Sequence, residues 1–265
     1  MRHALFLPLF DDLAEPAVVV RLAAEAEEAG WDGVFVWDHI GYREPVRAIA
    51  DPWITMSAIA VATSSVRIGP MITPLPRRRP VVVARQVASL DQLCDGRLVL
   101  GVGIGGDGAG ELSATGEELD DRTRGAMLDE SLGILRAAWT GEPLAHVGEH
   151  YTAKDLTVLP TPVQPGGPPV WVAARYGNPK PLRRAAQHDG FFPIDLTSPD
   201  QLAEVVATVT ELRGDLDGYD VVIGGRDPGP YAAVGATWWA ASFSPYEISL
   251  DEVRGVLRDG PYSSG

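Results

Sequence analysis

The sequence predicts a single-domain α/β protein folded as a (β/α)8 barrel. Its length of 265 residues suits one such barrel, short apolar runs alternate with stretches of helical spacing, and eight strands are counted in all. Barrels of this class typically take about 250 residues around one core. We therefore expect one domain over residues 1–265.

The first half of the chain alternates strands with helices. Strands are expected where short apolar runs lie between turn residues, and helices where apolar residues recur at helical spacing. We predict strands at Ala4–Leu9, Val34–His39, Val66–Thr73 and Arg97–Ile104, and helices at Ala17–Ala29, Pro52–Ala62 and Pro80–Cys94.

The middle of the chain is less regular. The stretch Gly105–Asp121 is rich in glycine and acidic residues and predicts a long loop, and long loops after barrel strands are usually functional. A helix is expected at Arg122–Thr140. Proline and glycine in Gly141–Pro169 predict an irregular excursion or a small hairpin.

The alternation then resumes. We predict strands at Val170–Ala174, Gly190–Ile194, Asp220–Ile223 and Ala236–Ala241, and helices at Pro181–His188, Pro199–Arg213 and Ser249–Leu257. Prolines and glycines between Ile223 and Gly235 leave the seventh helix very short or missing. An open doubly wound sheet has the same local rhythm, so barrel closure rests on the strand count and on the resemblance below.

The charge balance narrows the class of partner. Lys and Arg total 22 against 36 Asp and Glu, a formal net charge of -14. Such a surface repels phosphate backbones and anionic lipid. We therefore expect a small-molecule substrate, no nucleic acid and no membrane.

Cysteine usage and hydropathy point to the cytoplasm. Cys94 is the only cysteine, which excludes an internal disulfide, and we expect it to be a buried helix residue. No apolar run approaches the roughly 20 residues that cross a bilayer, and the first residues make a poor signal peptide.

Asp38 and His39 end the second predicted strand, where barrel enzymes build their sites. His39 is the candidate catalytic residue, with a purely structural histidine as the alternative. Because side chains alternate along a strand, the two residues need not point to the same place.

Glycines mark the fourth predicted strand. Gly101, Gly103 and Gly105 share the inward face, which predicts room for a flat ring near the backbone, although relief of crowding is the alternative. Gly103, Gly105 and Gly108 also match a dinucleotide fingerprint. That match is rejected, because an acidic loop rather than a helix follows it and the motif lies on the fourth strand.

Two other segments are candidates for anion binding. Arg77, Arg78 and Arg79 precede a helix start, where cations need a negative partner. A cofactor phosphate is one candidate, and ion pairs with Asp51 or Asp91 are the favoured alternative.

The turn after the fifth strand is the better phosphate candidate, with an ordinary loop as the alternative. Its residues are Ala174, Arg175, Tyr176 and Gly177. On the last strand, one of Trp238 and Trp239 must face the barrel interior, as core or as the wall of a ring pocket. No motif for metal hydrolysis, nucleotide phosphate binding or serine hydrolysis is present, so we expect no metal.

Taken together, these segments resemble the bacterial luciferase-like superfamily of flavin-dependent oxidoreductases. The resemblance covers most of the chain and rests on an ordered series: WDGVFVWDHI, DPWITMSAIAVATSSVRIGPMITPLPRRRP, ARQVASLDQLCDGRLVLGVGIG, VWVAAR and DGFFP.

The resemblance implies an oxidoreductase or monooxygenase that holds reduced FMN, or the deazaflavin coenzyme F-420 (F420), at the carboxyl ends of the strands. It places His39 near the reactive ring, Met71 behind the isoalloxazine, and a cis peptide at Pro70–Met71. The residues expected to bind the cofactor are Asp38, Pro70, Met71, Thr73, Gly103, Gly105, Ala174, Arg175, Tyr176 and Gly177.

The chain departs from the family pattern at two places. Gly106 stands where some deazaflavin-dependent members carry a catalytic acid, and Ile104 or its neighbours replace an Arg that flavin monooxygenases use near the phosphate. The first departure favours FMN and the second argues against it. A catalytically silent barrel that serves as a partner subunit is the alternative of another class. A separate flavin reductase and a homodimer stay open as partners, and the substrate is not predicted.

Overall fold

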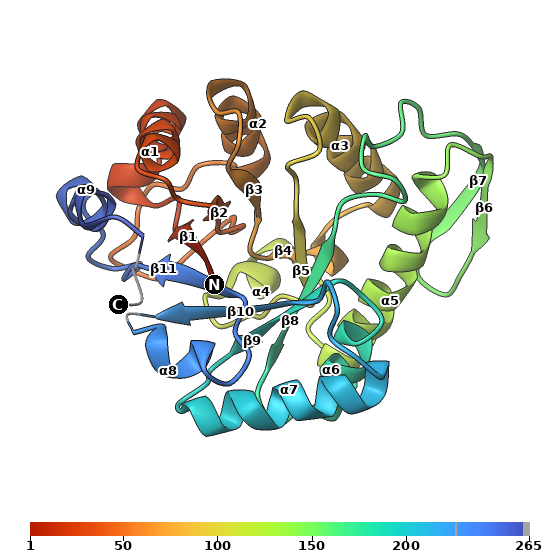
Figure 1. Cartoon of the computed structure of the whole chain (residues 1–265). Helices are drawn as coiled ribbons and strands as arrows, with labels where there is room; N and C mark the ends of the chain where they lie inside the picture. The colour runs from red at the N-terminus through yellow and green to blue at the C-terminus, as the bar shows by residue number, and fades with distance from the viewer. Residues whose placement is uncertain (226, 262–265) are drawn as a thin grey trace.

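The computed structural model describes residues 1–225 and 227–261 and places a parallel sheet at the centre of the molecule, with helices around it (Figure 1). The sheet runs in the order β3-β2-β1-β11-β10-β9-β8-β5-β4. Its strands are β1 (Arg2–Leu7), β2 (Gly33–Val36), β3 (Arg67–Pro70), β4 (Thr73–Pro74), β5 (Leu100–Gly103), β8 (Val170–Arg175), β9 (Gly190–Ile194), β10 (Asp220–Gly225) and β11 (Trp238–Ser242).

The sheet closes on itself because β3 and β4 act as two halves of one barrel strand. Thr73 of β4 pairs with Val102 of β5, and Ile68 of β3 bridges Leu98 just before β5. The hydrogen bond from Val99 N–H to the Ile68 carbonyl is 2.9 Å long. The predicted (β/α)8 barrel is therefore confirmed, and the open doubly wound sheet is excluded.

The helices are α1 (Pro16–Glu28), α2 (Pro52–Ala62), α3 (Pro80–Leu93), α4 (Glu111–Thr115), α5 (Asp121–Ala138), α6 (Pro179–Ala185), α7 (Pro199–Arg213), α8 (Gly229–Ala232) and α9 (Leu250–Asp259), with short 3-10 turns η1 (Asp11–Leu13) and η2 (Leu75–Arg77). Most of the helices lie outside the strands, and the short α4 lies at the barrel mouth (Figure 1). The excursion after α5 forms an antiparallel hairpin of β6 (Leu144–Val147) and β7 (Thr152–Leu156) beside α5 (Figure 1).

Local signals account for the helix starts. Asp51 accepts a hydrogen bond from Ile54 N–H, Ser198 accepts one from Gln201 N–H, and each is followed by a proline at the first helical position. The bounds predicted for α2, α7 and β9 match the structure, and α8 is very short, as expected. The loop Gly105–Asp121 contains α4, which the sequence did not predict.

Alternation along the strands produces two separate apolar clusters. Residues such as Phe6, Phe35 and Trp171 point into the barrel, and their chain neighbours pack outward under the helices. Trp238 belongs to the inner cluster and Trp239 to the outer one, as predicted. Trp238 is fully buried and donates to Asp220, the first residue of β10, so it fills the lower barrel and does not wall a ring pocket.

The inward glycines bring β3 and β5 together. A Cβ at Gly101 would lie 2.3 Å from the carbonyl oxygen of Pro70, and a Cβ at Gly103 would lie 2.9 Å from the Ile72 side chain. The expectation of a bare inward face is therefore wrong, because backbone and Ile72 occupy that space. A cofactor contact at Gly103 or Gly105 stays a prediction.

Gly69→Ala is expected to lower the free energy of unfolding by about 1–3 kcal/mol. The added Cβ would lie 2.1 Å from the carbonyl oxygen of Val99. The matched control is Gly133→Ala in α5, where nothing lies within 4 Å of the new Cβ. That control should stabilise the protein by about 0.5–1 kcal/mol. Equal effects of the two substitutions in urea titrations would show that strand approach is not what Gly69 provides.

His188 is a buried histidine away from the barrel mouth, just before β9. Its Nδ1 lies 2.8 Å from Arg136 Nη2, so it accepts a hydrogen bond in the neutral form. Burial, followed by the charge of Arg136, lowers the pKa of His188 from 6.5 to about 4. The unfolded chain therefore takes up a proton before the folded protein does.

Acidification is expected to destabilise the fold through His188. The contribution of neutral His188 to the free energy of unfolding is fully present above pH 6.5, the pKa of histidine in the unfolded chain. It is lost as the pH falls toward about 4, the pKa of His188 in the folded protein. We expect the free energy of unfolding to be about 2 kcal/mol lower at pH 5 than at pH 7. His188→Gln keeps a neutral acceptor for Arg136, so it should remove most of that difference. A variant with the wild-type pH dependence would refute the assignment.

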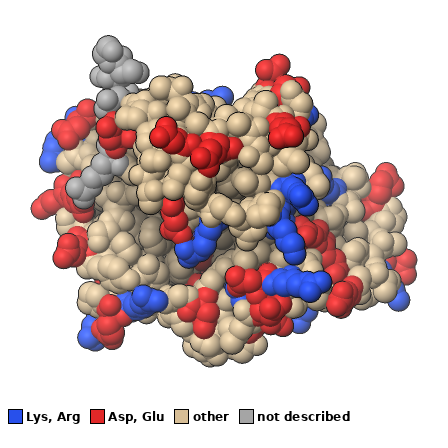
Figure 2. Space-filling view, turned by 90° about the horizontal axis from the view of Figure 1, so that it is seen from below, with Lys and Arg blue, Asp and Glu red and all other residues tan. Residues whose placement is uncertain are grey.

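The surface charge, the burial of the cysteine and the hydropathy of the helices agree with what the composition predicts. On the face in Figure 2, acidic side chains are widely spread and Lys and Arg lie between them rather than in one patch. Cys94 is buried, as predicted. Within residues 1–225 and 227–261, no helix is long and apolar enough to cross a membrane.

Candidate active site

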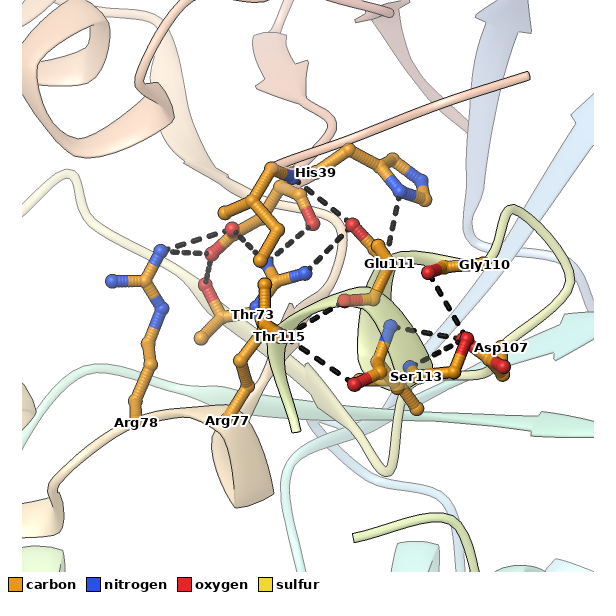
Figure 3. Close-up of polar contacts among 12 residues, drawn as sticks. His39, Thr73, Arg77, Arg78, Asp107, Gly110, Glu111, Ser113 and Thr115 are labelled. Atoms are coloured by element: carbon orange, nitrogen blue, oxygen red, sulfur yellow. Dashed lines mark hydrogen bonds and ion pairs between the residues drawn. The ribbon is translucent and has the colours of Figure 1, made fainter. Parts of the chain in front are cut away.

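The candidate site lies at the carboxyl end of the barrel, where three loops meet. His39 follows β2, Arg77 and Arg78 follow β4, and Glu111 begins α4 in the loop after β5. Figure 3 shows these side chains converging from their separate segments. Positions far apart in the sequence meet because parallel strands end at the same edge of the barrel.

Glu111 is the partner of His39. Its Oε1 lies 3.0 Å from Nδ1 of His39, and its Oε2 accepts a 3.0 Å hydrogen bond from Ile40 N–H. The side chain of Glu111 is 2% exposed and that of His39 is 27% exposed. The carboxylate is therefore hidden, and the imidazole lies between it and solvent.

The ionisation state of Glu111 defines the histidine tautomer. Burial alone would raise the pKa of Glu111, but the hydrogen bonds from His39 and Ile40, together with the charge of Arg77, hold that pKa below its usual value. An ionised Glu111 accepts, so Nδ1 of His39 carries the proton it donates. In neutral His39, Nε2 is then an acceptor, and no residue within the described ranges forms a hydrogen bond with it.

Asp38 holds the two arginines beneath this pair. Its Oδ1 lies 2.6 Å from Arg77 Nη2, its Oδ2 lies 2.8 Å from Arg78 Nη2, and Thr73 donates to Oδ2 over 2.8 Å. Arg77 also forms a 2.9 Å ion pair with Oε2 of Glu111. The network therefore links Arg78, Asp38, Arg77, Glu111 and His39 in one chain of contacts.

This network corrects the expected partners of the arginines. Arg77 and Arg78 find carboxylates, but the partners are Asp38 and Glu111 rather than Asp51, which caps α2, or Asp91, which accepts from Gln164. Asp38 and Thr73 are both buried and bonded to each other. A contact of either residue with the cofactor stays a prediction.

A turn in the loop after β5 positions Glu111. Oδ1 of Asp107 accepts from Leu112 N–H at 2.9 Å and from Ser113 N–H at 3.0 Å (Figure 3). Arg43 donates to the Gly108 carbonyl and ties this loop to the one after β2. Sequence reasoning missed Glu111, because the only signal was a long acidic loop with several carboxylates.

An apolar floor lies at the barrel mouth beside the His39–Glu111 pair. Four partly exposed side chains form it, and they pack on the buried residues Phe6, Met71 and Phe192. The four are Trp37, Ile72, Ala173 and Ile194. A cis peptide joins Met71 to Ile72, so the expected position at Pro70–Met71 is wrong by one residue. Pro70 and Met71 are buried, below Ile72.

A hollow of about 160 Å³ adjoins the floor at the carboxyl ends of β9 and β10. It shares Phe192 and Ile194 with the inner cluster and is also lined by Tyr231. The volume suits part of a small molecule rather than all of it. Within the described chain, no three His, Cys, Asp or Glu side chains are grouped to hold a metal ion.

The turn after β8 lies at the same end of the barrel. Arg175 pairs with Asp195, the Tyr176 hydroxyl contacts Glu204, and Gly177 adopts a φ of +80°. Ala174 is buried beneath them. Arg175 therefore already has an acidic partner. Phosphate binding by these residues stays a prediction.

A comparison with protein families identifies the group to which the protein belongs. A family model described as luciferase-like monooxygenase matches residues 6–226. The chain belongs to this family. The resemblance predicted from the ordered segments is thereby confirmed.

Curated relatives carry names of dehydrogenases. The chain is 35% identical over 182 residues to an F420-dependent glucose-6-phosphate dehydrogenase of Amycolatopsis mediterranei, covering 66% of this chain and 53% of the relative. A protein of the same name from Gordonia bronchialis is 32% identical over 251 residues, covering 87% of this chain and 71% of the relative. The chain thus spans about half the length of several curated relatives that it matches.

Solved structures confirm the fold. An F420-dependent secondary alcohol dehydrogenase, solved with an F420-acetone adduct, superposes with a TM-score of 0.74 at 24% identity, covering 84% of this chain and 68% of its own. The monooxygenase RslO1 of Streptomyces bottropensis gives a TM-score of 0.77 at 19% identity, covering 97% of both chains. The relatives and structural neighbours named above are dehydrogenases and a monooxygenase, all of them oxidoreductases.

Proposed function

We propose that the protein is an oxidoreductase that moves a hydride between a small alcohol or carbonyl compound and coenzyme F420 bound at the barrel mouth. The observation that carries the proposal is the His39–Glu111 pair, which presents an unoccupied Nε2 beside an apolar floor. Oxidising an alcohol requires an acceptor for its hydroxyl proton, and an imidazole backed by a carboxylate is suited to that task.

The residues at the mouth fit a flat tricyclic ring. Trp37, Ile72, Ala173 and Ile194 present apolar surface at the open end of the barrel, and such surface excludes water from a reacting ring. When bound, F420 supplies a two-electron hydride acceptor. The same floor also accommodates the ring of FMN, so the choice between the cofactors depends on other observations.

Two observations favour F420. Relatives above 30% identity are named as F420-dependent dehydrogenases. Glu111 also supplies a carboxylate in the loop where Gly106 suggested that the acid was missing, and this removes the argument that favoured FMN.

In the proposed reaction, His39 moves the proton and Glu111 orients His39. Nε2 accepts the hydroxyl proton, while Nδ1–H continues to donate to Glu111, whose negative charge stabilises the imidazolium. Arg77 balances the carboxylate from the other side. In the reverse direction the same imidazolium protonates the carbonyl oxygen.

Cofactor titration tests the proposal. We expect purified protein to bind F420 more tightly than FMN, oxidised or reduced, when binding is followed by fluorescence or calorimetry. Ile72→Asp places a charge on the floor and should weaken binding at least about tenfold. The control Ile54→Asp, at an isoleucine of α2 that is 66% exposed, should bind as the wild type does.

The other outcomes separate the alternatives. Tighter binding of reduced FMN would reject the F420 proposal in favour of a flavin monooxygenase. Binding of none of the three would reject both and favour a catalytically silent barrel. Equal effects of the two substitutions would place the cofactor away from the floor.

A further inference from the structure

The hollow at the carboxyl ends of β9 and β10 lies beside the short helix α8. α8 supplies Tyr231 to its wall, and the loop after β9 supplies Leu196. Both side chains are half-buried and pack against the outer apolar cluster. The fold itself therefore holds this part of the wall in place, beside the barrel helix that the sequence shortens.

Apolar and aromatic side chains form the side-chain part of the wall. They belong to Phe192, Pro193, Ile194, Leu196, Ile223 and Tyr231, and Gly224 adds no side chain. The polar groups of the lining residues are the Asp195 carboxylate, the Tyr231 hydroxyl and the main chain. A wall that is mostly apolar in its side chains, with a few polar groups, is typical of sites for small organic ligands.

The charge at the hollow is already balanced. Asp195 is the charged residue among the described residues that line it, and its carboxylate pairs with Arg175 at the end of β8. A charged group that enters the hollow would lose hydration, and this pair offers it no net charge in return. We therefore expect a neutral occupant.

The volume of the hollow limits the size of the occupant. An enclosed apolar cavity of about 150 Å³ binds benzene. The hollow measures about 160 Å³ and is partly open to solvent. One six-membered ring therefore fits the hollow.

The hollow is continuous with the apolar floor. Phe192 and Ile194 line the hollow and also belong to the inner cluster. The ring of Phe6 lies 5.7 Å from the ring of Phe192 and 5.5 Å from that of Trp37. A ligand on the floor can therefore extend a side group into the hollow.

We infer that the hollow is a subsite for a neutral, apolar group of about the size of a benzene ring, carried by the substrate away from its reacting atoms. The assignment to the substrate rests on the proposed function. Burial of such a ring removes apolar surface from water, and ring contacts with Phe192 and Tyr231 add to the binding energy. Leu196 and Tyr231 then decide which side groups the protein accepts.

Binding of small aromatic probes to the cofactor-free protein provides the test. The probes are fluorobenzene, 4-fluorobenzoate and 4-fluorobenzylamine, which share a ring and differ in charge. Each is titrated into the purified protein while its fluorine NMR signal is followed. We expect fluorobenzene to bind at least about fivefold more tightly than either charged probe. A charged probe that binds as tightly as fluorobenzene, or a protein that does not bind fluorobenzene, would overturn the inference.

Substitutions separate the hollow from the floor. Leu196→Trp fills the hollow and should weaken fluorobenzene binding at least about fivefold. The control Leu212→Trp, at a leucine of α7 that is 47% exposed, should stay within about twofold. Ile72→Asp, which places a charge on the floor, should also stay within about twofold. Equal effects of the two tryptophan substitutions, or weaker binding in Ile72→Asp alone, would place the ring outside the hollow.

A second pair of variants tests the wall without filling the space. Tyr231→Ala removes a ring from the wall and should weaken fluorobenzene binding at least about threefold, whereas Tyr231→Phe keeps the ring and should stay within about twofold. A folded Tyr231→Ala protein that binds the probe as the wild type does would show that Tyr231 does not form the subsite.

Competition tests the assignment to the substrate. In protein loaded with F420, fluorobenzene at a concentration equal to its own Kd should raise the apparent Kd of 1-phenylethanol about twofold in single-turnover reduction. It should leave the affinity for F420 unchanged. An apparent Kd of the alcohol that does not respond to fluorobenzene would detach the subsite from the substrate.

The two proposals fail in different ways. If fluorobenzene binds in the hollow but F420 does not bind, the proposed function fails and the subsite stands. If F420 binds and Leu196→Trp binds fluorobenzene as the wild type does, the inference fails and the proposed function stands.

Discussion

Replacing His39 by alanine is expected to lower single-turnover hydride transfer by about 10²–10⁴ while leaving the affinity for F420 within about twofold. The variant removes Nε2, the group placed to accept the hydroxyl proton. It leaves the apolar floor of Trp37 and Ile72 intact. The rate is measured from the absorbance of the bound deazaflavin after mixing with alcohol, and the affinity from a separate titration.

His146→Ala is the matched control. His146 also bonds a glutamate, Glu130, at 2.8 Å, but it lies on the β6–β7 hairpin. The His146→Ala variant should transfer hydride at the wild-type rate. A folded His39→Ala protein that binds cofactor and turns over normally would show that His39 has no part in the chemistry.

Asp38→Ala is expected to lower the free energy of unfolding by about 3–5 kcal/mol. The side chain of Asp38 is 0% exposed, and it balances Arg77 and Arg78, which are 4% and 19% exposed. Removing the carboxylate leaves two nearby guanidinium groups, and among the described residues Glu111 is then the one carboxylate in contact with either. Urea unfolding at neutral pH provides the measurement.

Asp12→Ala, at an exposed aspartate of η1, is the control for Asp38→Ala and should change stability by less than about 0.5 kcal/mol. Asp38→Asn keeps the shape and one acceptor oxygen but not the charge, so it should fall between the two. An Asp38→Ala protein as stable as the control would mean that the arginines are balanced by solvent rather than by Asp38.

The sequence predicted the barrel well because its signals are local. Capping residues such as Asp51 and Ser198, each before a proline, define helix starts, and strand residues alternate between inner and outer clusters. The broken third strand was not predictable in the same way. The interruption at Met71 and Ile72 depends on close packing against Gly101 and Gly103, which are distant in sequence.

The site was predicted only in part. His39 was found because it ends a predicted barrel strand, but Glu111 was not, because its role depends on a short helix whose first residue contacts the loop after β2. Asp38 was predicted to bind the cofactor, and in the structure its carboxylate pairs with Arg77 and Arg78 of the loop after β4. Which carboxylate meets which arginine is decided by loop conformation, and local spacing does not encode it.

Single-turnover reduction of F420 bound to the protein is the most direct test of the central claim, that the His39–Glu111 pair accepts the proton released during hydride transfer. We predict that 1-phenylethanol reduces the bound deazaflavin, more slowly when its carbinol carbon carries deuterium. Glu111→Gln should slow the step at least about tenfold without changing cofactor affinity. Wild-type protein that binds F420 but leaves it oxidised with every alcohol tried, or a Glu111→Gln variant as fast as the wild type, would contradict the account.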